Sequence, residues 1–63
     1  MSDPPDLLAR LRHDLSNPLA ALMIETQLLL QHPDRLDAET LTGLREIEKQ
    51  ARRIRDMLQA TRA

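Results

Sequence analysis

Leucines recur with helical spacing along the first half of the chain. One face carries a leucine every seven residues, and neighbouring positions widen this stripe. The repeating residues are Leu8, Leu15, Leu22 and Leu29, and the flanking residues are Leu7, Leu11, Leu19 and Thr26. The spacing predicts an amphipathic helix over about residues 4–31, with Asp3 positioned to cap it and Pro4 in its first turn.

A second apolar stripe follows after a break in the pattern. Pro33 disfavours the helical conformation in the residue before it, so a turn is expected over about residues 32–37. Asp37 is then positioned to cap a second helix over about residues 38–62. The apolar residues of that helix repeat at alternating spacings of three and four: Leu44, Ile47, Ala51, Ile54 and Leu58.

These two helices predict an all-α fold, an antiparallel hairpin that forms a single domain over residues 1–63. Helices of this length make a hairpin on the order of 40 Å long. A lone hairpin buries only one side of each stripe, which is too little to offset the conformational entropy lost on folding. Two copies side by side bury all four stripes in a four-helix bundle, so we predict an obligate homodimer. Met23 and Met57 are expected to fill its core.

Composition narrows the class of protein. With 63 residues, no Cys, no Val and no aromatic residue, the chain has no basis for a β-sheet core, a disulfide framework or a thiolate zinc site. Residues 1–39 carry 3 basic and 7 acidic side chains, and residues 40–63 carry 6 basic and 3 acidic, so the net charge is -1. The acidic N-terminus and the short apolar run at residues 19–24 predict a cytoplasmic protein without membrane insertion.

A histidine lies on the face of the first helix opposite the leucine stripe. His13 precedes Leu15 by two residues, which places it about 160° away around an α-helix. The same outer face carries Arg10, Asn17, Ala20 and Ile24. A surface built only for solubility would carry Glu and Lys at these positions, so we expect a partner to dock there.

Pro18 interrupts the helical pattern. Inside a helix a proline removes one backbone hydrogen bond and clashes with the carbonyl four residues back, here that of Asp14, at a cost of about 3 kcal/mol. One interpretation is a helix that ends near Asp14 and restarts with Asn17 as its cap. The leucine repeat stays in phase across the proline, which favours one continuous helix kinked near Pro18.

Three residues beside this proline have side chains suited to phosphoryl chemistry. A neutral imidazole such as that of His13 is nucleophilic at physiological pH, and the carboxylate of Asp14 can hold its second ring nitrogen. The amide of Asn17, one turn later, can orient a phosphoryl oxygen or a water molecule. On spacing alone, however, an exposed histidine is more often an ordinary surface residue. His32 lies 19 residues from His13, so no metal site is predicted.

The segment RHDLSNPLAAL resembles the H-box of the dimerisation and histidine-phosphotransfer domain of two-component sensor histidine kinases. That motif consists of His, Glu or Asp, Leu, a variable residue, Thr or Asn, Pro and Leu. The matching residues are His13, Asp14, Leu15, Asn17, Pro18 and Leu19. The later segment LREIEKQARRIRDMLQATR is similar to the family's second helix, so the resemblance covers nearly the whole chain.

The resemblance implies roles for individual residues. His13 would be the phosphoacceptor, attacking the γ-phosphate of ATP through Nε2 and later passing the phosphoryl group to an aspartate of a response-regulator receiver domain. Asp14 would act as base and orienter of Nδ1. Asn17 would position water for dephosphorylation of the regulator, and Pro18 would supply a helix bend. The chain would thus contribute the phosphoacceptor of a protein-histidine kinase.

The resemblance also implies partners, because ATP would be bound elsewhere. Gly43, the single glycine, lies in helical sequence without the neighbouring glycines of a phosphate loop. We therefore interpret it as a position that loosens the helix or allows close packing. We therefore expect no cofactor in this chain. ATP and Mg²⁺ are expected only on a kinase domain, which acts in trans or belongs to a longer parent protein, or on the receiver partner.

The position of the turn decides which residues accompany the histidine. If the hairpin folds at residue 34 or 35, His13 lies level with about residue 56, near Arg52, Arg53 and Arg55. These arginines can steer an acidic or phosphorylated partner. The residues predicted to contact a partner are Arg10, Ala20, Ile24 and Arg53.

The alternative function is a non-catalytic helical-hairpin dimer, either a Rop-like RNA binder or an oligomerisation scaffold. RNA binding relies on a basic surface, commonly with aromatic side chains that stack on bases. The net charge of -1 and the lack of aromatic residues therefore argue against a nucleic-acid partner.

Overall fold

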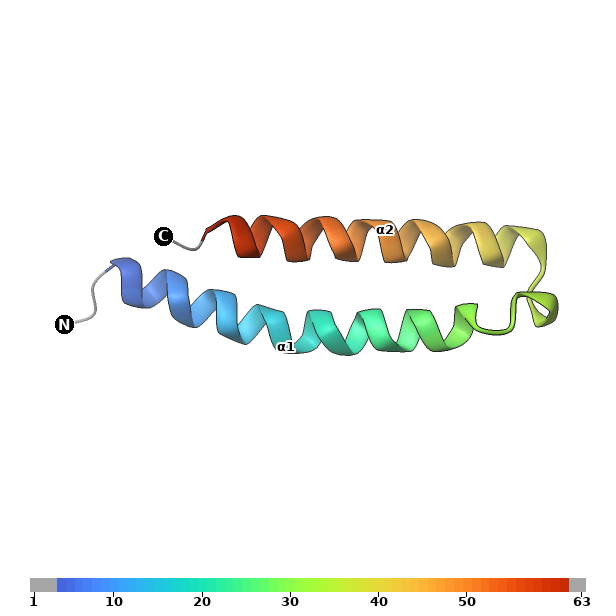
Figure 1. Cartoon of the computed structure of the whole chain (residues 1–63), viewed down its shortest axis with the longest axis horizontal. Helices are drawn as coiled ribbons and strands as arrows, with labels where there is room; N and C mark the ends of the chain where they lie inside the picture. Colours follow the sequence, from blue (N-terminus) through green and yellow to red (C-terminus); the bar gives the residue numbers. More distant parts are fainter. Residues whose placement is uncertain (1–3, 62–63) are drawn as a thin grey trace.

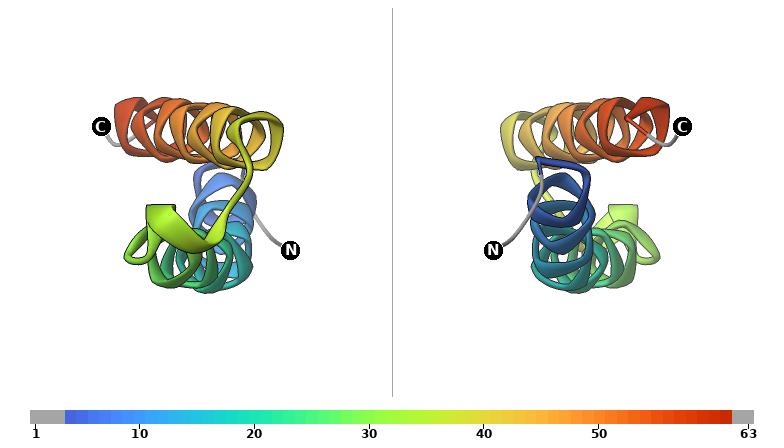
Figure 2. Two further views of the ribbon diagram at one scale, coloured as in Figure 1. Left: turned by 90° about the vertical axis from the view of Figure 1, so that its right-hand side faces the viewer. Right: turned by 90° about the vertical axis from the view of Figure 1, so that its left-hand side faces the viewer.

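The computed structural model describes residues 4–61, which form two long antiparallel helices (Figure 1). α1 covers Pro4–Leu30, a 3-10 turn, η1, covers Pro33–Arg35, and α2 covers Ala38–Ala60. The end views in Figure 2 place α2 above α1. The pair is 52 Å long and 15 by 14 Å across, and the prediction of an all-α helical hairpin is confirmed. Asp3, predicted to cap the first helix, lies outside the described residues.

Local hydrogen bonds reverse the chain between the helices. The backbone N–H of Arg35 donates to the carbonyl of His32 at 3.0 Å, and that of Leu36 donates to the carbonyl of Pro33 at 3.1 Å. Pro33 stands at the start of η1, where its fixed φ suits the turn and its missing N–H is not needed. The proline therefore separates α1 from the reversal.

Few side chains are buried between the two helices. Among the described residues, Thr26 of α1 and Ala51 of α2 are the two that are buried, with 4% and 3% of their surface exposed. The hydroxyl of Thr26 donates to the carbonyl of Leu22 at 2.7 Å, so this buried polar group is paired. Further half-buried apolar residues of this contact are Leu19, Met23, Leu30, Leu41, Leu44 and Leu58.

The predicted leucine stripe lies beside this helix contact, where it remains half exposed. The exposed fractions are 52%, 49%, 47% and 53% for Leu8, Leu15, Leu22 and Leu29. On α2, Ile47 and Ile54 are 46% and 49% exposed. One neighbouring helix covers only one side of each stripe, so much of the apolar surface stays open in a single hairpin.

The two methionines predicted as core filler differ in their surroundings. Met23 is half-buried between the helices, whereas Met57 is 62% exposed. The prediction for Met57 is therefore wrong for the single hairpin. Leu58, the next residue, lies about 100° further around α2 and takes the inner position instead.

One hydrogen bond fixes which residues lie level across the hairpin. Nη1 of Arg12 donates to Oγ1 of Thr61 at 3.2 Å, so His13 lies level with about residue 60. The predicted level of residue 56 is wrong. The centre of the reversal lies midway between residues 12 and 61, at 36.5, whereas the prediction placed it at residue 34 or 35. The difference arises because η1 occupies the start of the reversal, so the centre lies closer to α2.

α1 remains helical through Pro18, so the alternative of a helix that restarts at Asn17 is wrong. Pro18 has no N–H to donate to the carbonyl of Asp14. Both residues are exposed, which leaves that carbonyl on a turn where water can serve as its donor. The local loss is therefore smaller than it would be inside a core.

The carboxylate of Asp37 caps α2. Its Oδ1 accepts a hydrogen bond from the backbone N–H of Thr40 at 2.7 Å, which confirms the predicted cap. The side-chain and the backbone hydrogen bonds from Thr40, in that order, hold the pKa of Asp37 below its ordinary value of 3.8. The folded state therefore favours the charged carboxylate.

We expect the hairpin to lose stability in acid partly through Asp37. A folded pKa below the unfolded value stabilises the fold above the unfolded pKa, and this contribution is lost as the pH falls through the folded pKa. Asp37→Asn keeps an acceptor oxygen that does not titrate, so its thermal midpoint should decline less than that of wild type as the pH falls well below 3.8.

Circular dichroism measures the thermal midpoints of the wild type and Asp37→Asn at each pH. Asp37→Ala removes the acceptor, so it should be less stable than the wild type even at neutral pH. Superimposable acid profiles of the wild type and Asp37→Asn would contradict this role of the carboxylate. Thr42→Ala, at an exposed position of the same helix, is a control that should leave the acid profile unchanged.

Candidate functional site

His13 lies in the third turn of α1 with most of its side chain in solvent. Its side chain is 78% exposed, and that of the adjacent Asp14 is 66% exposed. Nδ1 of the imidazole lies 3.5 Å from Oδ1 of Asp14. The structure therefore brings together the histidine and the carboxylate that the sequence singled out.

This contact distinguishes the two nitrogens of the ring. A carboxylate beside Nδ1 favours the neutral tautomer that carries its proton on Nδ1, which leaves the lone pair on Nε2. Because both side chains are exposed, the contact between His13 and Asp14 adds little to stability, and its chemical effect is to orient the ring. In that tautomer Nε2 is the ring nitrogen whose lone pair is available to an electrophile.

Asn17 shares a surface depression with His13. The depression has a volume of about 330 Å³ and is lined by Ala9, Arg12, His13, Ser16 and Asn17. The predicted pairing of imidazole and carboxamide, one helical turn apart, thus forms a common concave surface. Ser16 was not predicted for this site, and its hydroxyl donates to the carbonyl of Arg12 at 2.6 Å within the helix. The imidazole and the amide therefore line one depression on the surface of α1.

Arg12 is a second residue that sequence reasoning missed. It is half-buried, it lines the depression with His13, and its guanidinium donates to Thr61 at the end of α2. Arg12 therefore places a positive charge beside the histidine and links that turn of α1 to α2. The signal that could have found it is the register across the hairpin, which the sequence did not fix.

A further cavity of about 300 Å³ opens between the helices next to this depression. Its polar residues are Arg12, Ser16, Arg55 and Gln59, and its apolar residues are Leu19, Ala20, Met23 and Leu58. Arg55 also contacts the carboxylate of Asp56 at 3.3 Å. The cavity between the helices is therefore lined by two arginines and by an apolar wall, and it shares Arg12 and Ser16 with the depression at His13.

The four residues predicted to contact a partner are all exposed but do not converge. Ala20 lines the cavity between the helices, whereas Arg53 does not, and Arg55 takes that place. Arg10 and Ile24 lie on the outer surface of α1, and Ile24 is 56% exposed. Two residues turn an α-helix by about 200°, so Arg55 faces the cavity between the helices while Arg53 faces away from it.

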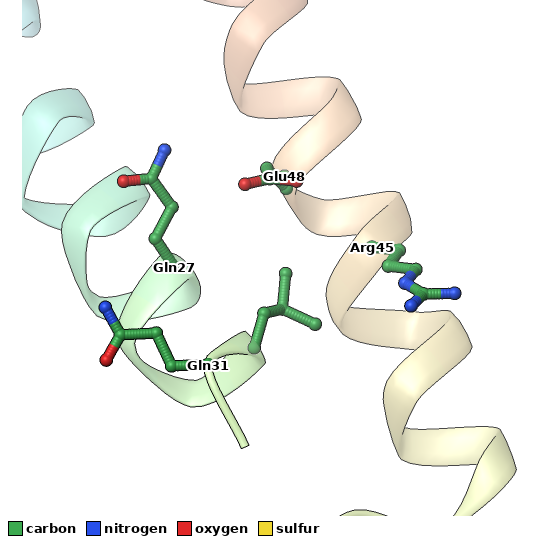
Figure 3. Close-up of a pocket in the computed structure, with 5 residues that line it drawn as sticks. Gln27, Gln31, Arg45 and Glu48 are labelled. Atoms are coloured by element: carbon green, nitrogen blue, oxygen red, sulfur yellow. The ribbon is translucent and has the colours of Figure 1, made fainter. Parts of the chain in front are cut away.

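A separate cavity of about 430 Å³ lies toward the turn of the hairpin, between Gln27, Leu30 and Gln31 of α1 and Arg45 and Glu48 of α2. Figure 3 shows the two amides of α1 across from the charged residues of α2. The side chain of Glu48 is 20% exposed and lies 3.5 Å from Arg52, so the two form an ion pair across one turn of α2. None of the five lining residues is a histidine.

An apolar concavity, here called the apolar groove, has a volume of about 490 Å³ and runs between the exposed parts of the two stripes. Its lining residues are Leu19, Leu22, Gly43, Glu46, Ile47, Gln50, Ala51 and Ile54. His13 does not line it. The histidine and the uncovered apolar surface therefore occupy different faces of the hairpin.

Two further findings bound the chemistry. Within residues 4–61, the His, Asp and Glu side chains form no group of three or more that could hold a metal ion. Neither of the two long helices, over the part of the chain that the structure describes, is apolar enough along its length to cross a membrane.

Comparison with protein families gives a match to the His Kinase A (phospho-acceptor) domain over residues 6–63. Comparisons with curated proteins and with solved structures give no significant match. The matched range includes His13 and its surroundings, the turn and all of α2, and it agrees with the resemblance in the sequence. The chain therefore belongs to the HisKA family, the phosphoacceptor and dimerisation domain of histidine kinases.

Proposed function

We propose that this HisKA domain accepts a phosphoryl group on Nε2 of His13 and passes it to an aspartate of a response-regulator receiver domain. The observation that carries the proposal is the geometry of His13, whose side chain is 78% exposed and whose Nδ1 lies 3.5 Å from Asp14. The family match favours this function over an RNA-binding or purely scaffolding hairpin.

The chemical step follows from the roles of the two ring nitrogens. The lone pair of Nε2 attacks the γ-phosphorus of ATP, a nitrogen–phosphorus bond forms, and the bond to the bridging oxygen breaks so that ADP leaves with the electron pair. The carboxylate of Asp14 stabilises the positive charge that develops on the ring and holds the proton on Nδ1. Transfer to an aspartate oxygen then breaks the nitrogen–phosphorus bond and returns the lone pair to Nε2 of His13.

Asn17 is proposed to position water for dephosphorylation of the receiver. It lines the same depression as His13, and its carboxamide carries both a donor and an acceptor. A water molecule held by this amide lies on the surface that the phosphorylated aspartate approaches. The carboxamide does not need to change protonation state, so it orients the water without acting as a base.

Pro18 is proposed to bend α1 just beyond this site. The missing backbone hydrogen bond to Asp14 removes a restraint at this position. The inclination of the N-terminal part of α1 relative to the rest of the helix in Figure 1 supports a bend of this kind. Such a bend lets the turn that carries His13 move relative to α2.

The functional unit is proposed to be a homodimer in which two hairpins form a four-helix bundle. The half-exposed Leu22 of α1 and the isoleucines Ile47 and Ile54 of α2 line the apolar groove and lack a covering element within the described residues. A second hairpin supplies matching stripes. HisKA domains dimerise, which supports this assembly.

The remaining partners follow from the chemistry. An ATP-binding kinase domain, in the same longer polypeptide or in trans, is proposed to hold ATP and Mg²⁺ and to present the γ-phosphate to His13. A receiver domain is proposed to dock on the exposed surface of the hairpin, with Arg10, Ala20, Ile24 and Arg53, all exposed, as its predicted contacts. We place these encounters in the cytoplasm.

Incubation with a histidine-kinase catalytic domain and ATP, or with a phosphorylated receiver domain, tests the phosphoacceptor. We expect an acid-labile, base-stable phosphoramidate on the wild type and none on His13→Gln, because glutamine lacks the nucleophilic nitrogen. His32→Gln is the matched control and should be labelled like the wild type. Label that persists in His13→Gln would refute the assignment.

For Asn17→Ala we expect phosphotransfer from His13 to remain near the wild-type rate while dephosphorylation of the receiver slows by about a hundredfold, the scale of losing one positioned polar group. Radiolabelled receiver decay measures the second rate. Ser16→Ala, in the same depression, is the control and should leave both rates unchanged because the Ser16 hydroxyl is engaged within the helix. Equal loss of both rates would instead indicate a structural defect near Pro18.

For the dimer, we expect sedimentation to give twice the chain mass for the wild type at micromolar concentration and a monomer for Leu22→Glu. A carboxylate in the apolar groove has no partner and opposes its burial. Leu28→Glu is the matched control, because Leu28 is also half exposed, at 51%, but does not line the groove. A folded monomeric wild type would overturn the assembly.

A further inference from the structure

Gly43 lies in the second turn of α2, where no feature of the hairpin requires a glycine. Glycine destabilises the interior of a helix relative to alanine. The backbone of Gly43 does not adopt a positive φ, so an ordinary residue could take its conformation. A Cβ atom built on Gly43 would meet nothing within 4 Å, so neighbouring side chains do not exclude one either.

Gly43 lies on an apolar surface that the hairpin itself leaves uncovered. Gly43 lines the apolar groove together with Leu22, Ile47 and Ile54. These three side chains are 47%, 46% and 49% exposed, so the walls of the groove are apolar and uncovered in the single hairpin. The missing side chain leaves the backbone of α2 accessible at one point of an otherwise apolar surface.

We infer that Gly43 is a close-approach position in the interface between two copies of this chain, where a large apolar side chain of the second copy packs against its backbone. The inference rests on the proposed dimer and adds the position that fixes how the two hairpins fit. Glycine has no side chain, so a partner side chain can reach the helix backbone there, as it does in tightly packed helix pairs.

A second copy fits this groove better than an unrelated partner. In a two-fold interface the same patch serves both chains, so each hairpin must supply both a protruding surface and a recess. The half-exposed Leu15 and Leu29 of α1, which do not line the groove, provide the protruding side chains, and the groove at Gly43 provides the recess. Glu46 is the single charged residue of the lining, which suits an apolar occupant.

Substitution of Gly43 sets two effects against each other. Alanine or leucine raises the intrinsic helix propensity of α2, which strengthens a hairpin whose groove is empty. In a dimer that uses the recess, the added atoms occupy the space of the partner side chain, and overpacking weakens the interface. A weaker dimer in the Gly43 variants therefore indicates a groove that the partner occupies, whereas an unchanged or stronger dimer indicates an empty groove.

Sedimentation equilibrium over a range of concentrations, with helix content followed by circular dichroism, measures this sign. We expect Gly43→Leu to raise the dimer dissociation constant by at least about tenfold, and Gly43→Ala to raise it less, with helix content retained at high concentration. Thr42→Leu is the matched control, because the adjacent Thr42 is exposed and does not line the groove, and it should leave the dissociation constant unchanged.

The outcomes separate this inference from the proposed dimer. A dimeric wild type with an unchanged or smaller dissociation constant in both Gly43 variants would overturn the role of Gly43 and leave the dimer in place. A monomeric wild type would overturn the dimer and with it this inference. If Gly43→Leu does not fold, Gly43→Ala decides, because a single Cβ meets no neighbour in the hairpin itself.

Discussion

The whole structure depends on the limited contact that two helices make. A helix in this hairpin has one neighbour, so only the side chains that point at that neighbour leave solvent, and among the described residues only Thr26 and Ala51 are buried. The leucine stripe of α1 is wider than this contact, so part of it remains half exposed. An apolar surface of that extent on so small a chain favours association. The leucines that stay exposed in a single hairpin contribute hydrophobic stabilisation only when a partner covers them.

The same geometry divides α1 into three faces with different tasks. One face packs on α2 through Leu19, Met23 and Thr26, and the adjacent face carries the half-exposed leucines, of which Leu22 lines the apolar groove. The third face, on the far side, carries His13 and Asn17. Because the helical period keeps these faces separate, dimerisation and phosphoryl transfer do not compete for the same surface. A dimeric phosphoacceptor can thus be built from two helices.

The features that the sequence predicted well are local ones. The cap at Asp37, the break before Pro33 and the contact of His13 with Asp14 involve residues at most a few positions apart, so side-chain chemistry and helical spacing suffice. The register between the helices depends on the exact path of the turn, and η1 moved it by about four residues. For that reason the contact of Arg12 with Thr61 and the place of Arg55 in the cavity between the helices emerged only from the structure.

Two residues violate local helix rules, and both lie where the proposed function needs something that an ordinary residue does not provide. Pro18 lacks the N–H that would tie its turn to Asp14, so the segment carrying His13 has one restraint fewer. Gly43 lacks the side chain that would cover the backbone of α2 in the apolar groove. Neither violation is compensated by a contact within the described hairpin. Since a stable fold otherwise favours agreement between local propensity and structure, such exceptions point to motion in one case and to an external partner in the other.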